Sequence, residues 1–198
     1  DVVDDLWHSG TGEDKLRAVA YHADSDHIFA GGSFTKDLGV SGATIQTVTD
    51  DFTTDGFVFR YARVGLVPNE TAVIGETEGT SGQNDRVDGI AASGSDVFVS
   101  GLYEGPINGQ PDPALKSIFA AQFSTADLTP GWLRTASGDG ALDFAGLAIT
   151  GGSVRMAFNA IGSVMVGGTD QPGLGGEDAF IANFALGESL NVIQRGRA

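Results

Sequence analysis

A strand-like aromatic segment that recurs three times at nearly constant spacing is the feature that most constrains the fold. The segment is centred on Phe57, returns 62 residues later at Phe119 and 61 residues after that at Phe180, and an aromatic residue follows four positions after each. Side chains alternate between the two faces of a β-strand, so these aromatic residues share one face. The spacing predicts three strands, each with this face in the core, over residues 55–61, 117–123 and 178–184.

Two further segments recur upstream of each aromatic strand. The first reads small–aliphatic–alanine, and its copies are Ala18–Ala20, Gly89–Ala91 and Gly146–Ala148, preceded by the acids Asp14, Asp85 and Asp143. The second is an apolar run that closes on glycine, with copies at Ile28–Gly32, Val97–Gly101 and Val164–Gly168. A fainter fourth strand follows each aromatic strand, near Val73, Trp132 and Ile193. Each unit of about sixty residues is therefore expected to hold four short strands separated by glycine-rich turns.

Four short strands per unit are the composition of a propeller blade, a four-stranded antiparallel sheet that packs face to face on its neighbours. We therefore expect an all-β chain of three four-stranded antiparallel, propeller-blade-like repeats in a single domain over residues 1–198. The repeats cover about residues 9–76, 77–136 and 137–198, and an extra N-terminal strand covers residues 1–8. Insertions lengthen the first unit at 33–54, where 44–49 alternate like a strand, and the second at 102–116. The third is expected to carry a longer hairpin around Phe158–Ala160.

These residues resemble the SBBP β-propeller repeats of bacterial secreted and surface proteins. In that family a blade runs from a Trp and a glycine-rich turn through a Gly–aliphatic–Ala strand to a Gly-Gly-x-Asp-Ala-Phe-x-Ala strand. The best-matching copy here is Gly175–Ala182, together with Val164–Thr169. The chain departs from the pattern in its long insertions and in the missing Trp of two copies. The resemblance implies an extracytoplasmic bacterial β-propeller, periplasmic, secreted or on the cell surface, that is used in binding or adhesion, and it brings no catalytic residues.

The number of units bears on function, because closed propellers have roughly four to eight blades. A terminal unit is therefore expected to expose the apolar row Phe57, Phe59 and Tyr61 that internal units bury, and such patches mark partner surfaces. The propeller is then either incomplete or completed by an oligomer, and we expect a protein partner or a homo-oligomer. The leading function is a noncatalytic binding or scaffold module that acts through protein–protein contacts as a subunit of an oligomer or larger complex.

Charge and composition exclude several classes of function. The net charge of −15, from 26 acidic and 11 basic residues, repels phosphate backbones, so we expect no nucleic-acid partner. The chain has no cysteine, which removes disulfides, thiolate metal sites and cysteine nucleophiles. No apolar stretch approaches the roughly 18 residues that span a bilayer, so we expect no membrane-spanning segment.

The segment His22–His27 contains two histidines and two acids, Asp24 and Asp26, and could hold a metal ion. Ala-Asp-Ser-Asp between two strands is also ordinary turn chemistry, and a turn is the preferred interpretation. The closely spaced acids within 139–143 and 50–55 do not follow the Asp-x-Asp-x-Asp-Gly order of a calcium loop, so turns or sheet edges are favoured there too. We therefore assign no metal ligand, no cofactor and no catalytic residue.

Two alternative functions stay open at this stage. One is a polysaccharide-active hydrolase or lyase with paired carboxylates, such as Glu76 with Glu78 or Asp85 with Asp88. The other is a carbohydrate-binding lectin, which needs aromatic platforms in loops; of the candidates Trp7, Trp132 and Tyr103, only Tyr103 lies outside the predicted strands. Three arginines could bind an anion, but solvated or salt-bridged environments are favoured for Arg60, Arg86 and Arg134.

Overall fold

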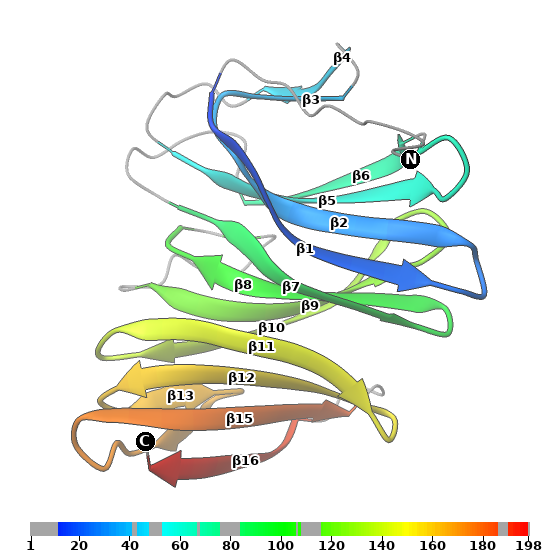
Figure 1. Ribbon diagram of the computed structural model, residues 1–198. Coiled ribbons are helices and arrows are strands. Elements are labelled where there is room, and N and C mark those ends of the chain that lie inside the picture. The colour runs from blue at the N-terminus through cyan, green and yellow to red at the C-terminus, as the bar shows by residue number, and fades with distance from the viewer. Residues whose placement is uncertain are drawn as a thin grey trace.

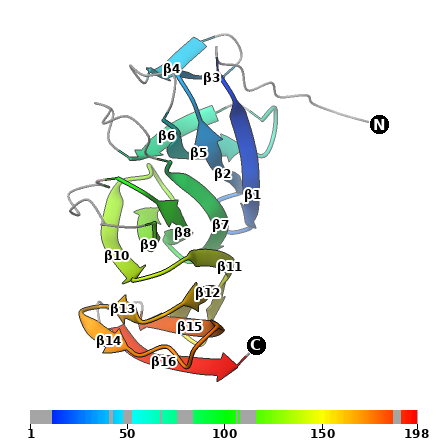
Figure 2. The same ribbon diagram turned by 90° about the vertical axis from the view of Figure 1, so that its left-hand side faces the viewer.

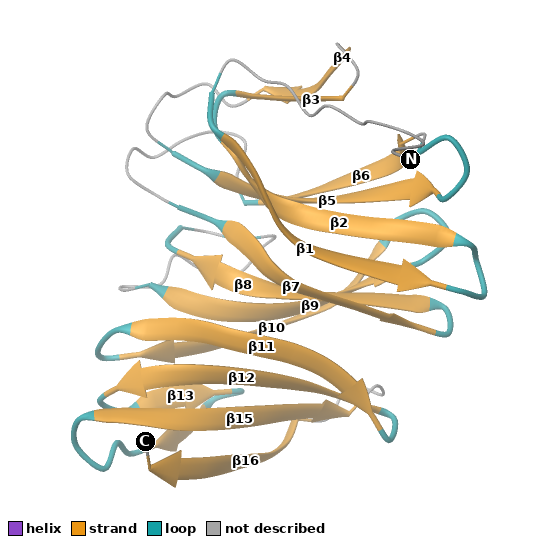
Figure 3. Ribbon diagram, in the orientation of Figure 1, coloured by secondary structure: helices purple, strands orange, loops and turns teal. Residues whose placement is uncertain are grey.

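The computed structural model describes residues 12–40, 43–47, 53–66, 68–75, 84–105, 107, 116–185 and 190–197. Within these ranges the chain forms β-strands joined by turns, and no helix (Figure 3). The strands build three antiparallel sheets that stack one above another, together with a small hairpin at the N-terminal end of the stack (Figure 1). The expectation of an all-β chain with antiparallel sheets is therefore confirmed, whereas the expected strand over residues 1–8 lies outside the described residues.

The first and third sheets each contain four strands. The first has the order β1–β2–β5–β6, formed by Asp14–His22, His27–Phe34, Asp55–Ala62 and Pro68–Ile74. The third has the order β11–β12–β15–β16, formed by Leu142–Thr150, Ser153–Ile161, Glu177–Ala185 and Leu190–Arg197. The inserted hairpin pairs β3, Asp37–Val40, with β4, Ala43–Thr47. It includes part of the alternating stretch that was expected to form an extra strand.

The second sheet has six strands. Four of them follow the same order as in the other sheets, β7–β8–β9–β10, formed by Arg86–Ser93, Asp96–Tyr103, Ser117–Ser124 and Pro130–Gly138. A hairpin from the third unit, β13 (Val164–Val166) and β14 (Thr169–Gln171), extends this sheet at β10. The hairpin therefore joins the second and third units. Its two strands belong to the second sheet, while the strands before and after it in the chain, β12 and β15, belong to the third.

That hairpin corrects one sequence-based prediction. The run Val164–Gly168 was expected to be the second strand of the third unit, but that place is taken by β12, which pairs with both β11 and β15. Phe158–Ala160, where a hairpin was expected, lie inside β12. Val164–Gly168 resembles the second strands of the other two units because it is also a short apolar strand that ends in glycine. Here Gly167 and Gly168, at φ 56° and 78°, form the tight turn of the hairpin.

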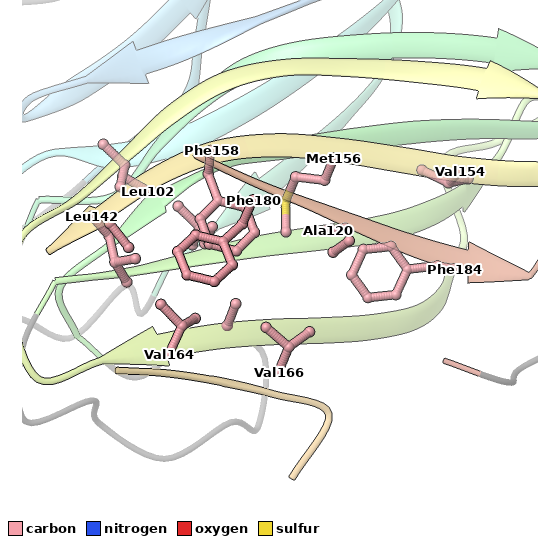
Figure 4. Close-up of a cluster of buried hydrophobic side chains, with 14 of the residues drawn as sticks. Leu102, Ala120, Leu142, Val154, Met156, Phe158, Val164, Val166, Phe180 and Phe184 are labelled. Atoms are coloured by element: carbon pink, nitrogen blue, oxygen red, sulfur yellow. The ribbon is translucent and has the colours of Figure 1, made fainter. Parts of the chain in front are cut away.

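The aromatic strands lie at the centre of the three sheets and supply the core. Phe57, Phe119 and Phe180 are buried, with exposed fractions of 0%, 0% and 1%. Between the second and third sheets, the rings of Phe158 and Phe180 stack with centroids 5.4 Å apart, and Val164 and Val166 of the hairpin close the cluster (Figure 4). The prediction that one face of each aromatic strand is core is confirmed.

The expected exposure of the first aromatic row is wrong. Phe57 and Phe59 are fully buried and Tyr61 is 3% exposed, although no further sheet precedes the first in the described chain. The reason lies in the insertion between β2 and β5. Leu38 of β3 is itself fully buried and belongs to the same apolar cluster as Phe57. The chain thus covers this row with its own residues.

Candidate functional site

The first strands of the three units lie next to one another along one side of the stack. β7 contacts both β1 and β11, and each of the three strands is an edge strand of its sheet (Figure 2). Each also has a β-bulge at the same place, between Leu16 and Ala18, Val87 and Gly89, and Phe144 and Gly146. The shared bulge sets the register, so equivalent residues of the three strands can be compared directly.

Three apolar positions around this bulge have different surroundings in the three units. In the second and third units their residues pack into the clusters between neighbouring sheets; they are Val87, Ile90 and Ala92, and Phe144, Leu147 and Ile149. In the first unit the same positions are exposed: Leu16 by 56%, Val19 by 70% and Tyr21 by 54%. We call Leu16, Val19 and Tyr21 the β1 row. Its residues have the chemistry of an interface but no described neighbour covers them.

The two internal interfaces show what such a row packs against. A methyl group added at Gly31 of the first sheet would lie 2.8 Å from side-chain atoms of both Val87 and Ile90. One added at Gly89 of the second sheet would lie 2.7 Å from the Phe144 ring. Each row thus packs on backbone that only glycine leaves free, because a Cβ atom would occupy the same space.

Each of these glycines lies on the face of its sheet that points toward the following sheet, which we call the receiving face. We compare this face through one set of residues that pair across the first three strands of each sheet. The paired sets are Ala18, Gly31 and Val58; Gly89, Ser100 and Ala120; and Gly146, Ala157 and Ile181. On the first two sheets these positions are covered, since Val58, Ser100 and Ala120 are all 0% exposed. On the third sheet Ile181 is 42% exposed, and a methyl group at Gly146 would meet nothing within 4 Å. The third receiving face is therefore open.

A second feature is a pair of buried acids between the first and second sheets. Thr54 and Asn84 form a parallel bridge, and the backbone N–H of Asp85 donates to the Thr54 carbonyl oxygen at 2.7 Å. This register places the carboxylates of Asp55 and Asp85, which are 4% and 2% exposed, together beside Gly75. The sequence patterns did not predict this pair. Asp55 begins β5 and Asp85 directly precedes β7, and the bridge brings the starts of these two strands together.

The environment of Asp85 favours its protonated form. Burial raises the pKa of Asp85 to about 7; the backbone N–H of Glu104, which donates to Asp85 Oδ1 at 3.0 Å, opposes the rise, and the nearby Asp55 carboxylate adds to it. A substrate cannot reach carboxylates that are this deeply buried. The pair can instead hold a proton inside the fold and link stability to pH.

An open pocket of about 630 Å³ lies between the second and third units. Its charged lining residues are Lys116, Asp139, Asp143 and Glu177. Lys116 forms an ion pair with Glu104 at 3.2 Å, and the Asp139 carboxylate packs against Gly162. In the part of the chain that the structure describes, no group of three or more His, Asp or Glu residues is arranged to hold a metal ion. The pocket is thus an acidic recess without an assigned ligand.

The segment His22–His27 is a turn, as preferred from the sequence. The Asp26 N–H donates to the Ala23 carbonyl oxygen at 3.4 Å, and His22 Nδ1 lies 2.8 Å from Ser25 Oγ. Asp26 Oδ1 accepts bonds from the Tyr21 hydroxyl at 2.9 Å and Arg63 Nε at 2.5 Å. The side chains of this segment therefore bond within the turn and to the neighbouring strands.

The two carboxylates of the candidate pair Asp85 and Asp88 lie in different environments. Asp88 forms ion pairs with Arg86 at 2.8 Å and with Arg17 at 3.6 Å, whereas Asp85 lies beside Asp55. Glu76, Glu78, Asp50 and Asp51 lie outside the described residues. The salt-bridged environment expected for Arg86 is thus observed. Arg60 donates to the Thr125 carbonyl oxygen at 3.2 Å, and Arg134 lies over the Trp132 ring at 5.7 Å.

The aromatic candidates for a sugar platform pack against other aromatic rings where they are described. Trp132 lies 5.9 Å from each of the rings of Phe98 and Phe184. Tyr103, which was expected outside the strands, is the last residue of β8 and is 3% exposed, because its ring packs edge-on against Phe119. Trp7 lies outside the described residues.

The β1 row was only partly visible from the sequence. Val19 belongs to the small–aliphatic–alanine signal, but Leu16 and Tyr21 were not singled out. Aligning the flanks of that signal would have found them, since Leu16, Val87 and Phe144 each lie three positions before the central aliphatic residue. Their exposure depends on the order of the sheets, which no local pattern contains.

Among the described residues no helix is long and apolar enough to cross a membrane. A comparison with models of known protein families gives no match, and a comparison with curated protein sequences gives none either. The SBBP resemblance therefore stays a prediction, and the proposals below depend on the geometry of this chain.

Proposed function

We propose that the protein is a noncatalytic binding or scaffold module, periplasmic, secreted or on the surface of a bacterium, that acts through protein–protein contacts as a subunit of an oligomer or larger complex. The observation that carries the proposal is the exposed β1 row. Leu16, Val19 and Tyr21 are more than half exposed, while both sets of equivalent residues pack against a neighbouring sheet. A row built for packing is thus available to a partner.

The energetics favour this use of the row. Each large apolar side chain that moves from water into an interface stabilises the complex by about 1.5–3 kcal/mol before the costs of association. The row also lies on an edge strand, which offers free backbone donors and acceptors beside the apolar side chains. Three adjacent residues of this kind are enough to form the centre of a small interface.

The same geometry supports the interpretation of the units as propeller blades. Each sheet contains four antiparallel strands in the same order, and the first strands of all three lie side by side, as the innermost strands of successive blades do. In this proposal the β1 row is the side of the first blade that a preceding blade would cover in a propeller. The enzyme and lectin alternatives have less support. Of the carboxylate pair Asp85 and Asp88, Asp85 is buried and Asp88 is paired with arginines, while Tyr103 is buried and Trp132 is partly buried against neighbouring rings.

A site-specific photocrosslinker tests the proposal in the cells that make the protein. Benzoylphenylalanine at position 19 is expected to give defined protein adducts on illumination, identified by mass spectrometry. The matched control is the same group at position 64, because Val64 is 75% exposed but lies in the turn between β5 and β6. If position 19 gives no protein adduct above the level at position 64, the β1 row is not a binding surface.

A further inference from the structure

We infer that the β1 row binds the receiving face of the third sheet in a second copy of this chain, head to tail. This inference rests on the proposed function and names the partner. One chain carries both an uncovered row, Leu16, Val19 and Tyr21, and an uncovered receiving face, Gly146, Ala157 and Ile181. These are the two halves of the contact that joins the first sheet to the second and the second to the third.

The two internal interfaces provide the template for the contact. In both of them a row from a first strand packs on a glycine of the preceding sheet, Gly31 for Val87 and Ile90, and Gly89 for Phe144. Gly146 holds the place of Gly89 on the third sheet, with open space above it. Leu16 and Val19 of a second copy would fill that space as Phe144 and Leu147 fill the space above Gly89.

The rest of the receiving face has the size that the template requires. Ala157 pairs with Gly146 and stands where Gly31 and Ser100 stand in the other sheets, so it remains small. Ile181 corresponds to Val58 and Ala120, which are fully buried, yet it is 42% exposed. An exposed isoleucine beside an open glycine is an apolar surface with room for the aliphatic side chains of the β1 row.

The template also requires both surfaces to be free at once, and they lie at opposite ends of the stack. The first sheet is at one end and the third at the other (Figure 1). A single chain cannot therefore satisfy both surfaces by itself, whereas a head-to-tail contact between copies satisfies them.

Sedimentation velocity over a range of protein concentrations tests the inference, at physiological salt or above so that the like charges of −15 are screened. Wild type is expected to gain mass with concentration. Val19→Asp on one surface and Gly146→Val on the other are each expected to weaken association at least about 100-fold, since one buries an unpaired charge and the other fills the open space. Gly146→Val is informative because a Cβ atom at this position meets nothing within 4 Å in the free chain.

Mixing the two variants distinguishes head-to-tail contact from a row-to-row contact. The Val19→Asp chain keeps its receiving face and the Gly146→Val chain keeps its β1 row, so their mixture is expected to form a complex at concentrations where each alone is monomeric. Val64→Asp and Met165→Asp are the matched controls, because both residues are exposed, by 75% and 51%, and lie outside the two surfaces. Circular dichroism and urea midpoints verify that each variant folds.

Three results would overturn the inference: a wild type that stays monomeric at the highest soluble concentration, association that survives Gly146→Val, or a mixture that forms no complex. The outcomes separate the two proposals. Crosslinks from position 19 to another protein, with a monomeric wild type, would keep the proposed function and remove the second copy as partner. An absence of any crosslink at position 19 would remove both.

Discussion

Replacing Asp85 by asparagine is expected to stabilise the protein at neutral pH and to remove much of the pH dependence of its stability in weak acid. Asp85 is 2% exposed, and its pKa is raised to about 7 from an ordinary value of 3.8. Below about pH 4 the carboxyl is protonated in both the folded and the unfolded chain, so it has no effect on stability. Between these two pKa values the folded state holds a proton that the unfolded state has lost, and stability falls as the pH rises.

The size of the effect follows from the shift. A difference of about three pKa units corresponds to roughly 4 kcal/mol, which is an upper limit for the stability lost above about pH 7. Asparagine keeps the oxygen that accepts the Glu104 N–H, and its amide can donate toward the Asp55 carboxylate. Asp85→Asn should therefore match wild type near pH 4 and exceed it by up to that amount near pH 8.

Urea unfolding at several pH values between about 4 and 8 measures the difference. With an m-value of about 2 kcal/mol per molar, the midpoint of the variant should rise by as much as about 2 M relative to wild type at the alkaline end. Asp170→Asn, which removes an exposed carboxylate of β14, controls for the change in net charge. Parallel midpoint curves for wild type and Asp85→Asn across the whole range would refute the assignment of a proton to Asp85.

Four further substitutions test the packing and the turn. Phe180→Ala, at the ring stacked on Phe158, is expected to lower the free energy of unfolding by about 3–5 kcal/mol in urea titrations, and a loss below about 1 kcal/mol would contradict the core described here. Gly32→Ala places a methyl group against the Lys15 carbonyl oxygen and should cost at least about 2 kcal/mol, whereas Gly146→Ala, with open space, should leave the urea midpoint nearly unchanged. Asp26→Ala removes the hydrogen bond that raises the pKa of Tyr21, so the Tyr21 pKa should fall in a spectrophotometric titration compared with wild type.

The sequence predicted those parts of the fold that are set by alternation along a single strand. The row Phe180, Ala182 and Phe184 could be assigned to one buried face because a strand places every second side chain on the same side. The fourth strands near Val73, Trp132 and Ile193 were predicted from their similar spacing after the aromatic strands, and they are β6, β10 and β16. Such patterns need no knowledge of the neighbouring sheets.

Features that depend on pairing between distant segments could not be obtained in this way. Val164–Gly168 has the residue pattern of a second strand, and only its pairing with β10 shows that it is an inserted hairpin. The Asp55–Asp85 pair depends on a bridge between Thr54 of one unit and Asn84 of the next. The cover over Phe57 depends on where the insertion places Leu38. In each case the contact joins distant segments, and the sequence around each residue does not indicate its partner.

The outer faces of the first and third sheets, at the two ends of the stack, differ in which residues they expose, and the difference bears on the proposed function. At the first sheet the chain covers the aromatic row yet leaves Leu16, Val19 and Tyr21 exposed. At the third sheet exposed Arg155 stands where Phe29 and Phe98 are buried in the other two, so part of that face is suited to water. An array that only needed solubility would have placed polar residues along the first strand as well. The apolar β1 row is therefore an argument for the proposed contact, and the small residues around Gly146 are an argument for the proposed receiving surface.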